Sequence, residues 1–329
     1  MEKYVDNNKQ MGITYMKIAV LTPKAEFATP LQQRLKNLGE IIYTDSRRPY
    51  SLAELVKLTK DVDILAIDPD NLGGFELAPN ILPKLLDQAS SIKSLALSTT
   101  SYGYIDEQYC QSRGIKVSNV PHYSSESVAE HAITLLLGCS KRIFVSDRQT
   151  QQGKYQLNMG QEISGKTLGI IGLGDIGSQT AKLAKGLGMK VIGWNRTPKK
   201  VRGVRNATLD ELLSQSDYIS IHLRDCEQTR GILSEEKISK LKRGVIIVNT
   251  ASRELVDEQV LAKALKSGLV DSYTLEAEDL KSGPLGKLKN AFLFKGFGWY
   301  TKEALERNKE IWVNNIVSHS KDNLTNRVY

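Results

Sequence analysis

The sequence lacks any apolar run of the roughly 18 residues that a membrane-spanning helix requires, so we expect no membrane span. It contains only three cysteines and four histidines, and neither set is spaced like the ligands of a metal ion. The N-terminus lacks a basic stretch followed by an apolar core, so we expect no secretory signal. These absences predict a cytoplasmic protein with no metal site and no membrane partner.

The charge is basic but dispersed. There are 45 Lys and Arg against 37 Asp and Glu, a formal net charge of +8, without a continuous basic stripe or a known nucleic-acid motif. We therefore expect an anionic small molecule, and not nucleic acid, as the binding partner. With 329 residues, of which 40% are apolar, the chain is long enough for two domains.

The most specific motif lies in residues 165–197. An apolar run over 167–171, suited to a buried parallel strand, is followed by Gly172, Gly174 and Gly177 in the spacing Gly-x-Gly-x-x-Gly. These glycines supply a tight turn, close approach of a pyrophosphate and helix–strand contact, and the helix that starts near Asp175 directs N–H groups at phosphate. Because the turn stands between a strand, a helix and a second strand, it predicts a dinucleotide-binding unit.

The residues after the second strand bear on which dinucleotide binds. NAD-specific domains usually carry an acidic residue there, whereas this chain has Asn195, Arg196 and Thr197, with Lys199 close behind. A carboxylate would repel a 2′-phosphate and a guanidinium would pair with it, so the sequence favours NADP(H), with NAD(H) as the alternative. A solvated basic loop is the other interpretation of these residues.

Apolar strand patterns alternate with helical patterns along most of the chain, which predicts an α/β fold with parallel sheets. A long helix expected to begin at Ser125 joins an earlier and a later half. The predicted fold is therefore two doubly wound parallel-sheet domains. Predicted strands cover 16–21, 64–67, 95–98, 116–118, 218–223, 245–249, 272–275 and 291–294, and predicted helices cover 30–38, 52–58, 125–137, 257–267 and 302–318.

Several further motifs are characteristic of one enzyme family. They are RGIKVSNVP at 113–121, SVAEH at 127–131, GLGDIG at 172–177, IHL at 221–223, TRG at 229–231, NTA at 249–251 and LVD at 255–257. Through these motifs, residues 16–316 resemble the D-isomer-specific 2-hydroxyacid dehydrogenases.

The resemblance implies a flavodoxin-like substrate domain formed by 16–118 and 298–329, an inserted NAD(P)-binding Rossmann domain at 119–297, a cleft between them and a homodimer. Residues 1–15 are polar and without periodicity, and we expect them to form an N-terminal extension. The expected cofactor-binding residues are Gly172, Gly174, Asp175, Ile176, Gly177, Asn195, Arg196, Thr197, Lys199, His222, Leu223, Thr229, Thr250, Ala251 and Ser252.

Members of the resembled family reduce 2-oxo acids with an arginine that grips the carboxylate, a histidine that donates the proton and a glutamate that keeps the histidine protonated. The resemblance places the arginine at Ser252, with Arg253 one position later, and the histidine at Gly296. It places the glutamate at Lys281, while Glu276 takes the position of an aspartate near the nicotinamide. A one-residue slip on extended chain turns a side chain to the other face, so ordinary 2-oxo acid reduction is not expected.

Three residues are candidates for a replacement catalytic role. Arg253 would act if its loop bends locally toward the cleft, and Glu276 would act from the end of its strand. His122 stands at a glycine position of the family pattern and suits acid or base chemistry near neutral pH, with a surface loop histidine as the alternative. The remaining histidines, which we expect to be structural, cofactor-adjacent or without a role, are His131, His222 and His319.

The substrate-grip loop also departs from the family pattern, because hydroxyl and aromatic side chains replace glycines that would form a backbone nest. Aromatic lining suits a larger and less polar substrate than a short oxo acid. The expected pocket residues are Thr99, Thr100, Ser101, Tyr102, Gly103, Lys295, Gly296, Trp299 and Tyr300, with Tyr104 at the cleft mouth.

Together these features predict an NAD(P)(H)-dependent oxidoreductase that is related to the resembled family and has a remodelled active site. Two alternatives stay open. One is a non-redox enzyme that uses the same cleft with bound cofactor, and the other is a nucleotide-sensing pseudo-enzyme that acts as a dimeric regulator.

Overall fold

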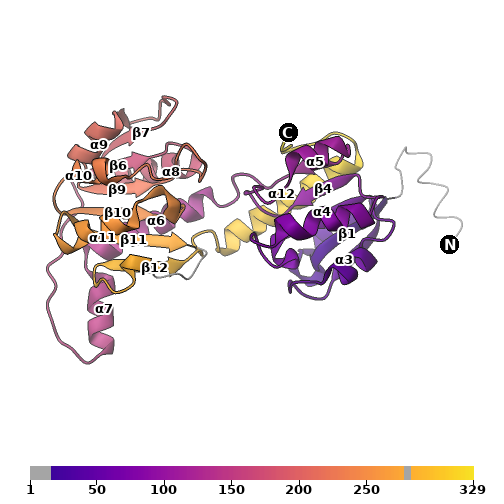
Figure 1. Cartoon of the computed structure of the whole chain (residues 1–329), viewed down its shortest axis with the longest axis horizontal. Coiled ribbons are helices and arrows are strands. Elements are labelled where there is room, and N and C mark those ends of the chain that lie inside the picture. The colour runs from indigo at the N-terminus through magenta and orange to yellow at the C-terminus, as the bar shows by residue number, and fades with distance from the viewer. Residues whose placement is uncertain (1–15, 278–282) are drawn as a thin grey trace, which may run out of the picture. The chain divides into compact units, whose positions relative to one another are not determined.

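The computed structural model describes residues 16–277 and 283–329, which form two compact units (Figure 1). The first unit combines residues 16–123 with 305–329, and the second comprises the described residues of 124–304. The predicted N-terminal extension at 1–15 and the residue Lys281 lie outside the described residues. Each unit is built around its own parallel sheet.

The first unit contains a five-stranded sheet in the order β2-β1-β3-β4-β5, and every pairing in it is parallel. This is the order of flavodoxin-like doubly wound sheets. β3 and β4 are buried along their whole length, as expected for strands that helices cover on both faces. The strands are β1 (Met16–Pro23), β2 (Gly39–Thr44), β3 (Ile64–Ile67), β4 (Ser94–Leu97) and β5 (Lys116–Ser118).

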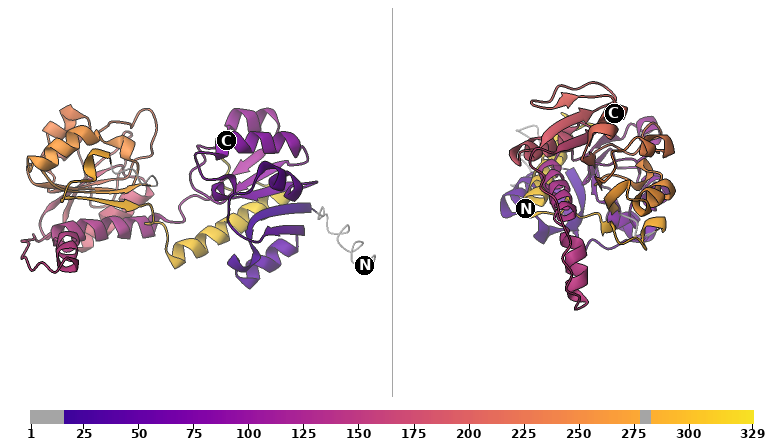
Figure 2. Two further views of the ribbon diagram at one scale, coloured as in Figure 1. Left: turned by 60° about the horizontal axis from the view of Figure 1, so that its bottom comes forward. Right: turned by 90° about the vertical axis from the view of Figure 1, so that its left-hand side faces the viewer.

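Helices cover both faces of this sheet (Figures 1 and 2). On one face, α2 (Thr29–Lys36) and α12 (Lys302–Ser320) bury Leu35 and Trp312 against the strands. The indole N–H of the fully buried Trp312 donates to the Ala96 carbonyl at 2.8 Å, so the last helix packs on the first unit. The other face carries α3 (Leu52–Leu58), α4 (Ala78–Gln88) and α5 (Glu107–Ser112).

The second unit contains a seven-stranded sheet in the order β12-β11-β10-β9-β6-β7-β8, again with parallel pairings throughout. From β6 the chain builds the sheet toward β7 and β8 on one side and then toward β9, β10, β11 and β12 on the other, so the chain order reverses at β6. In sheets of this kind a dinucleotide binds outside the carboxyl ends of the strands, with one half on each side of the reversal. The strands are β6 (Thr167–Ile171), β7 (Lys190–Trp194), β8 (Arg205–Asn206), β9 (Tyr218–Ile221), β10 (Val245–Asn249), β11 (Val270–Ala277) and β12 (Ala291–Lys295).

The second sheet is also covered on both faces. One apolar cluster lies under α6 and α8, and another lies under α9, α10 and α11. By contrast, α7 (Ile143–Gln151) buries none of its residues and extends away from the sheet in both figures. The covering helices are α6 (Ser125–Ser140), α8 (Asp175–Gly186), α9 (Leu209–Gln215), α10 (Glu235–Ser239) and α11 (Glu258–Lys266).

Two parallel-sheet α/β units confirm the predicted fold class. Within 16–277 and 283–329, no helix combines the length and the apolar character that crossing a membrane demands. The three cysteines are free, and Cys110 and Cys139 are buried.

Candidate functional site

The glycine turn joins β6 to α8 at the carboxyl edge of the second sheet. Gly172 has φ +101°, and a Cβ there would lie 2.5 Å from the carbonyl oxygen of His222. A Cβ on Gly177 would lie 1.9 Å from the Gly172 carbonyl oxygen, so neither position accepts a side chain. A Cβ on Gly174 would meet nothing within 4 Å, and no side chain caps α8, which begins at Asp175. This open space above a helix N-terminus suits a pyrophosphate.

The turn after β7 lies against the glycine turn. The Asn195 side chain accepts a hydrogen bond from the Leu173 N–H at 3.1 Å and donates one to the Thr197 carbonyl at 2.7 Å. Asn195 therefore binds backbone with both of its polar groups, while the side chains of Arg196, Thr197 and Lys199 are exposed. A ligand that spans the ends of β6 and β7 would meet the positive charge of Arg196 and Lys199 at the end of β7.

His222 follows β9, on the other side of the reversal at β6. Its Nε2 lies 2.8 Å from the Ser220 hydroxyl and its Nδ1 lies 3.5 Å from the Thr250 hydroxyl. Burial lowers the pKa of His222 to about 3. The imidazole is therefore neutral near pH 7, and it is not available as an acid.

Backbone contacts close the loop after β9. The Thr229 hydroxyl donates to the Arg224 carbonyl at 2.6 Å and accepts from the Cys226 N–H at 3.0 Å. Leu223 is half-buried and packs against the apolar cluster of the second unit. Thr229 thus shapes this loop with its side chain.

A buried asparagine organises the end of β10. The Asn249 amide donates to the Ser252 carbonyl at 2.9 Å, and its oxygen accepts from the Ala251 N–H at 3.0 Å. The Ser252 hydroxyl accepts from the Glu254 N–H at 3.2 Å and so caps the short helix η3 (Arg253–Leu255). The Ser252 side chain is therefore a helix cap in this chain.

The Arg253 guanidinium pairs with Glu258 on α11. Its Nε and Nη2 lie 3.1 and 3.0 Å from the Glu258 Oε1, and the two side chains are only 14% and 15% exposed. A pair this well buried is broken at a considerable cost, because one charge is then left uncompensated. The structure therefore anchors Arg253 to a carboxylate of its own unit.

Glu276, at the end of β11, binds the backbone of the segment that follows β12. Its Oε1 accepts hydrogen bonds from the N–H groups of Phe297, at 2.5 Å, and Gly298. His131 of α6 brings its Nε2 to 3.6 Å from the same oxygen, and its ring packs edge-on against Phe297 with centroids 4.9 Å apart. Burial lowers the pKa of His131, although the Glu276 charge opposes this. Ser127, one helical turn before His131, donates to the Gly298 carbonyl at 2.5 Å, so Gly298 is held on both sides.

In the first unit, the loop after β4 is held by its own hydroxyls. Thr99 Oγ1 donates to the Ser101 carbonyl and Thr100 Oγ1 to the Val120 carbonyl, each at 2.7 Å. The prediction that Tyr104 lies at a cleft mouth is wrong, because its ring packs in the apolar cluster beneath the sheet and is only 4% exposed, and burial raises its pKa. Tyr102 is half-buried, whereas Thr100, Ser101 and Gly103 are exposed.

Two histidines of the first unit differ in exposure. His122 is exposed and has φ +62°, in the left-handed region that glycine enters without steric cost. His319, by contrast, is buried. It lies in α12, where its Nε2 is 2.8 Å from the Ser118 hydroxyl, and burial lowers its pKa to about 4.

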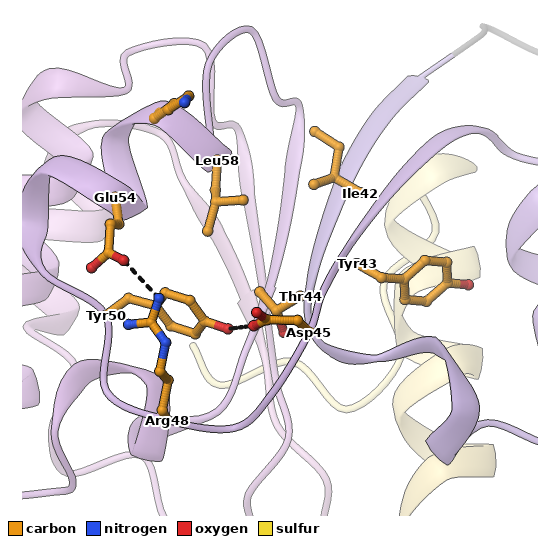
Figure 3. A pocket seen from close by; sticks show the side chains of 9 residues that line it. Ile42, Tyr43, Thr44, Asp45, Arg48, Tyr50, Glu54 and Leu58 are labelled. Carbon is orange, nitrogen blue, oxygen red and sulfur yellow. Dashed lines mark hydrogen bonds and ion pairs between the residues drawn. The ribbon is translucent and has the colours of Figure 1, made fainter.

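A separate hollow of about 470 Å³ lies on the first unit, between β2 and α3 (Figure 3). Three of its charged groups have partners: Arg48 binds Glu54 at 2.6 Å, and Asp45 accepts from the Tyr50 hydroxyl at 2.8 Å. None of the predicted site residues lines it. We therefore assign it no part in the candidate site.

The second unit brings together the predicted residues that follow β6, β7, β9, β10 and β11 at one edge of its sheet. His222 contacts Thr250, and the carbonyl of His222 abuts Gly172. The contact of His131 with Glu276 was not predicted. The signal in the sequence was the spacing of Ser127 and His131, which places both on one face of α6.

Comparisons with known proteins place the chain in a family. Residues 133–294 match the family described as D-isomer specific 2-hydroxyacid dehydrogenase, NAD binding domain. A hydroxypyruvate reductase of Blautia hydrogenotrophica is 33% identical over 311 residues, which cover 89% of this chain and 93% of the relative. A glyoxylate reductase of Korarchaeum cryptofilum is 30% identical over 290 residues, covering 83% and 84%.

Solved structures agree with this placement. An acyclic imino acid reductase in complex with NADPH and D-Arg matches with a TM-score of 0.82 and 29% identity, covering 95% of this chain and all of that one. The apo structure of D-lactate dehydrogenase from Escherichia coli matches with a TM-score of 0.79 and 26% identity, with the same coverage. The chain therefore belongs to the D-isomer-specific 2-hydroxyacid dehydrogenases, a family of NAD(P)-dependent oxidoreductases.

Proposed function

We propose that this protein is an NAD(P)H-dependent reductase with a rebuilt pocket, and that its substrate is not an ordinary 2-oxo acid. The contrast that carries the proposal lies within the second unit. Gly172 and Gly177 stand where no side chain fits, so the cofactor turn is retained. Ser252 and Gly296 stand where the family pattern has the arginine and the proton-donating histidine. A cofactor site without these two groups suits a different substrate.

Gly296 bears on which group is reduced. Reduction of a ketone adds a hydride to carbon and a proton to oxygen, so the site must hold an acid. An iminium ion already carries its proton on nitrogen. When hydride adds to its carbon, the C=N electron pair becomes the lone pair of the amine, and no further proton is required. Bound NADPH supplies the hydride, so a site in which Gly296 replaces the acid suits a protonated imine, the iminium ion.

The related imino acid reductase supports this chemistry. It is 29% identical to this chain over nearly its whole length, and its complex holds NADPH and D-Arg. We infer that the substrate here is the imine of an amino-acid-like compound. Lys295, which is exposed beside Gly296, is the candidate partner for the carboxylate of such a substrate.

We infer a preference for NADP(H) over NAD(H). Arg196 and Lys199 are exposed directly after β7, and Asn195 takes the place where an acidic residue would repel a 2′-phosphate. The predicted Rossmann domain at 119–297 binds the cofactor in this proposal, and the predicted substrate domain at 16–118 and 298–329 contributes the loop from Thr99 to Gly103.

The roles of the catalytic candidates depend on whether the substrate is a carbonyl compound or an imine. For a carbonyl compound, His122, Lys295 and Tyr300 are candidate acids with exposed side chains, whereas an iminium ion does not need them. Arg253 is anchored to Glu258, so in this proposal it stabilises the loop after β10. Glu276 stands nearest to the vacated position 296, through its contact with Phe297.

A homodimer in the cytoplasm is also part of the proposal. Tyr155, Leu157 and Met159, in the segment after α7, are between 84% and 91% exposed, and such a group of apolar side chains suits a contact with a second copy. The three free cysteines fit a reducing compartment.

The test is a substrate panel. Purified protein and NADPH are mixed with 2-oxo acids, with the imines that these form with ammonia, and with enones, while NADPH absorbance is followed. We expect oxidation with imines and little with the 2-oxo acids alone, and Gly177→Ala, which closes the cofactor turn, serves as the inactive control. Faster oxidation with the 2-oxo acids would contradict the proposal. No oxidation with any compound, together with bound nucleotide recovered unchanged by mass spectrometry, would favour the non-redox alternatives.

A further inference from the structure

Three aromatic side chains are exposed on the turn that follows β12. Phe297, Trp299 and Tyr300 are 47%, 38% and 64% exposed, and the Trp299 and Tyr300 rings meet edge to face with centroids 5.2 Å apart. We call residues 296–300 the aromatic turn. Large apolar side chains gathered at one exposed place commonly mark a binding surface.

The aromatic turn is fixed in shape before any ligand binds. The Trp299 indole N–H donates to the Gly296 carbonyl at 3.2 Å, and the Tyr300 N–H donates to the Phe297 carbonyl at 2.8 Å. Gly298 is held by Glu276 at its N–H and by Ser127 at its carbonyl. Because little chain entropy remains to be lost, ligand contacts with this turn are made at low cost.

Glu276 places a carboxylate directly beneath the turn. The group is buried, at 6% exposure, and in the described part of the chain it has no lysine or arginine partner within 4 Å. Among the described residues, His131 is the ionisable group beside it, and burial lowers the pKa of this imidazole while the Glu276 charge opposes the shift. All of its hydrogen bonds to described residues run through Oε1. A buried carboxylate without a cation is an unusual arrangement in a folded protein.

The strand order places the aromatic turn and Glu276 on the side of the sheet where the nicotinamide half of a dinucleotide would lie. β11 and β12 lie on the side of the reversal opposite to β7 and β8, and the turn follows their carboxyl ends. The adenosine half of a dinucleotide lies over the strands of the first half of such a sheet, so the nicotinamide half lies toward β9, β10 and β11. The aromatic turn and Glu276 are therefore at the reacting end.

We propose that Glu276 and the aromatic turn select a substrate that carries a positively charged organic group, such as a guanidinium or an ammonium, in addition to the carbon that is reduced. Faces of Trp and Tyr attract such cations, and the carboxylate beneath the turn supplies the opposite charge. Within the described residues, no cation lies over the Trp299 or Tyr300 ring. The inference rests on the proposed function, since it names the substrate class of the same site.

The experiment compares three matched substrates. They are the ammonia-derived imines of 2-oxo acids whose side chains have equal length and end in a guanidinium, a urea group or a carboxylate. We expect kcat/KM to be about tenfold higher for the guanidinium than for the urea compound, mainly through KM, and lowest for the carboxylate. The corresponding amino acids are also titrated against the complex with NADP+, and bound ligand is followed by tryptophan fluorescence.

Variants separate recognition from folding. Trp299→Leu and Glu276→Gln should each bring the guanidinium-to-urea ratio close to one, while the urea compound keeps its KM. Trp299→Leu changes an exposed side chain, so it remains informative if Glu276→Gln fails to fold. Leu187→Ala, which changes an exposed apolar side chain at the C-terminal end of α8, is the control and should leave the ratio unchanged.

Equal kcat/KM and equal affinity for the three compounds in the wild type would overturn the inference and leave the proposed function standing. An equal loss for all three compounds in both variants would also overturn it, because it would indicate a structural role only. Selective binding of the guanidinium compound without NADPH oxidation would instead refute the proposed function and retain the cation site.

Discussion

Replacement of Arg196 by alanine tests the cofactor preference most directly. Arg196 is exposed after β7 and makes no hydrogen bond to a described residue, so its loss should change stability by less than about 0.5 kcal/mol. A hydrogen bond to a charged group contributes about 1.5–3 kcal/mol, which corresponds to about 10- to 150-fold in affinity. We therefore expect Arg196→Ala to weaken NADPH binding by this factor and to leave NADH binding within about twofold.

Both affinities are measured by titration calorimetry at two salt concentrations. The NADPH affinity of the wild type should fall as salt rises, because the pairing is exposed, and the variant should have lost most of this dependence. Arg243→Ala is the matched control, since Arg243 is exposed in the turn that precedes β10, at the opposite edge of the sheet. Equal weakening of NADPH and NADH, or no change in either, would refute the assignment of Arg196 to a 2′-phosphate.

Three further results are expected. Gly177→Ala should abolish cofactor binding and lower the free energy of unfolding by about 1–3 kcal/mol, because the added Cβ would lie 1.9 Å from a carbonyl oxygen. Gly174→Ala should weaken cofactor binding without loss of stability, because its Cβ would meet nothing within 4 Å. Calorimetry measures binding and denaturant titration measures stability, and equal effects of the two variants would contradict the assignment of this turn. The pKa of His222 is about 3 in the folded state and near 6.5 in the unfolded state, so the unfolded state binds more protons between these values. The free energy of unfolding should therefore fall by about 1.4 kcal/mol per pH unit as the pH drops through this window, and His319, with a pKa of about 4, should add a similar slope. Urea titrations that give the same free energy of unfolding from pH 7 to 5 would contradict both. His122→Gly should raise the free energy of unfolding by up to about 1 kcal/mol, since it removes a histidine whose backbone is in the left-handed region. The variant should leave imine reduction unchanged and slow any carbonyl reduction. Slower imine reduction would show that the site does need this acid.

Local sequence signals were sufficient where one element decides its own structure. The run Thr167–Ile171 forms the buried strand β6, and the helix predicted over 257–267 is observed as α11, Glu258–Lys266. The first glycine of the turn has the positive φ that its place in the pattern requires. In each case a short pattern of apolar residues, caps or glycines specifies the backbone without help from distant parts of the chain.

Other elements carry no such signal and were not predicted. α4 contains Pro83 inside the helix, which normally argues against a helix, yet its apolar face buries Leu82, Leu85 and Leu86 against the sheet. α7 packs Phe144 and Val145, near its start, against the second unit and buries no residue fully, so its sequence lacks the apolar periodicity from which a helix is recognised. Packing against the sheet overrides the proline in the first case, and in the second the contacts are too few to leave a periodic pattern.

The sequence by itself determined that parallel α/β units are present and that one of them carries a dinucleotide turn. Both conclusions depend only on residue type and spacing, which a chain displays before it folds. The tertiary structure alone decided that Arg253 is paired with Glu258 and that His131 meets Glu276 beneath Gly298. Those partners are far apart along the chain or lie on different elements, and only the packing of helices against the sheet brings their side chains together.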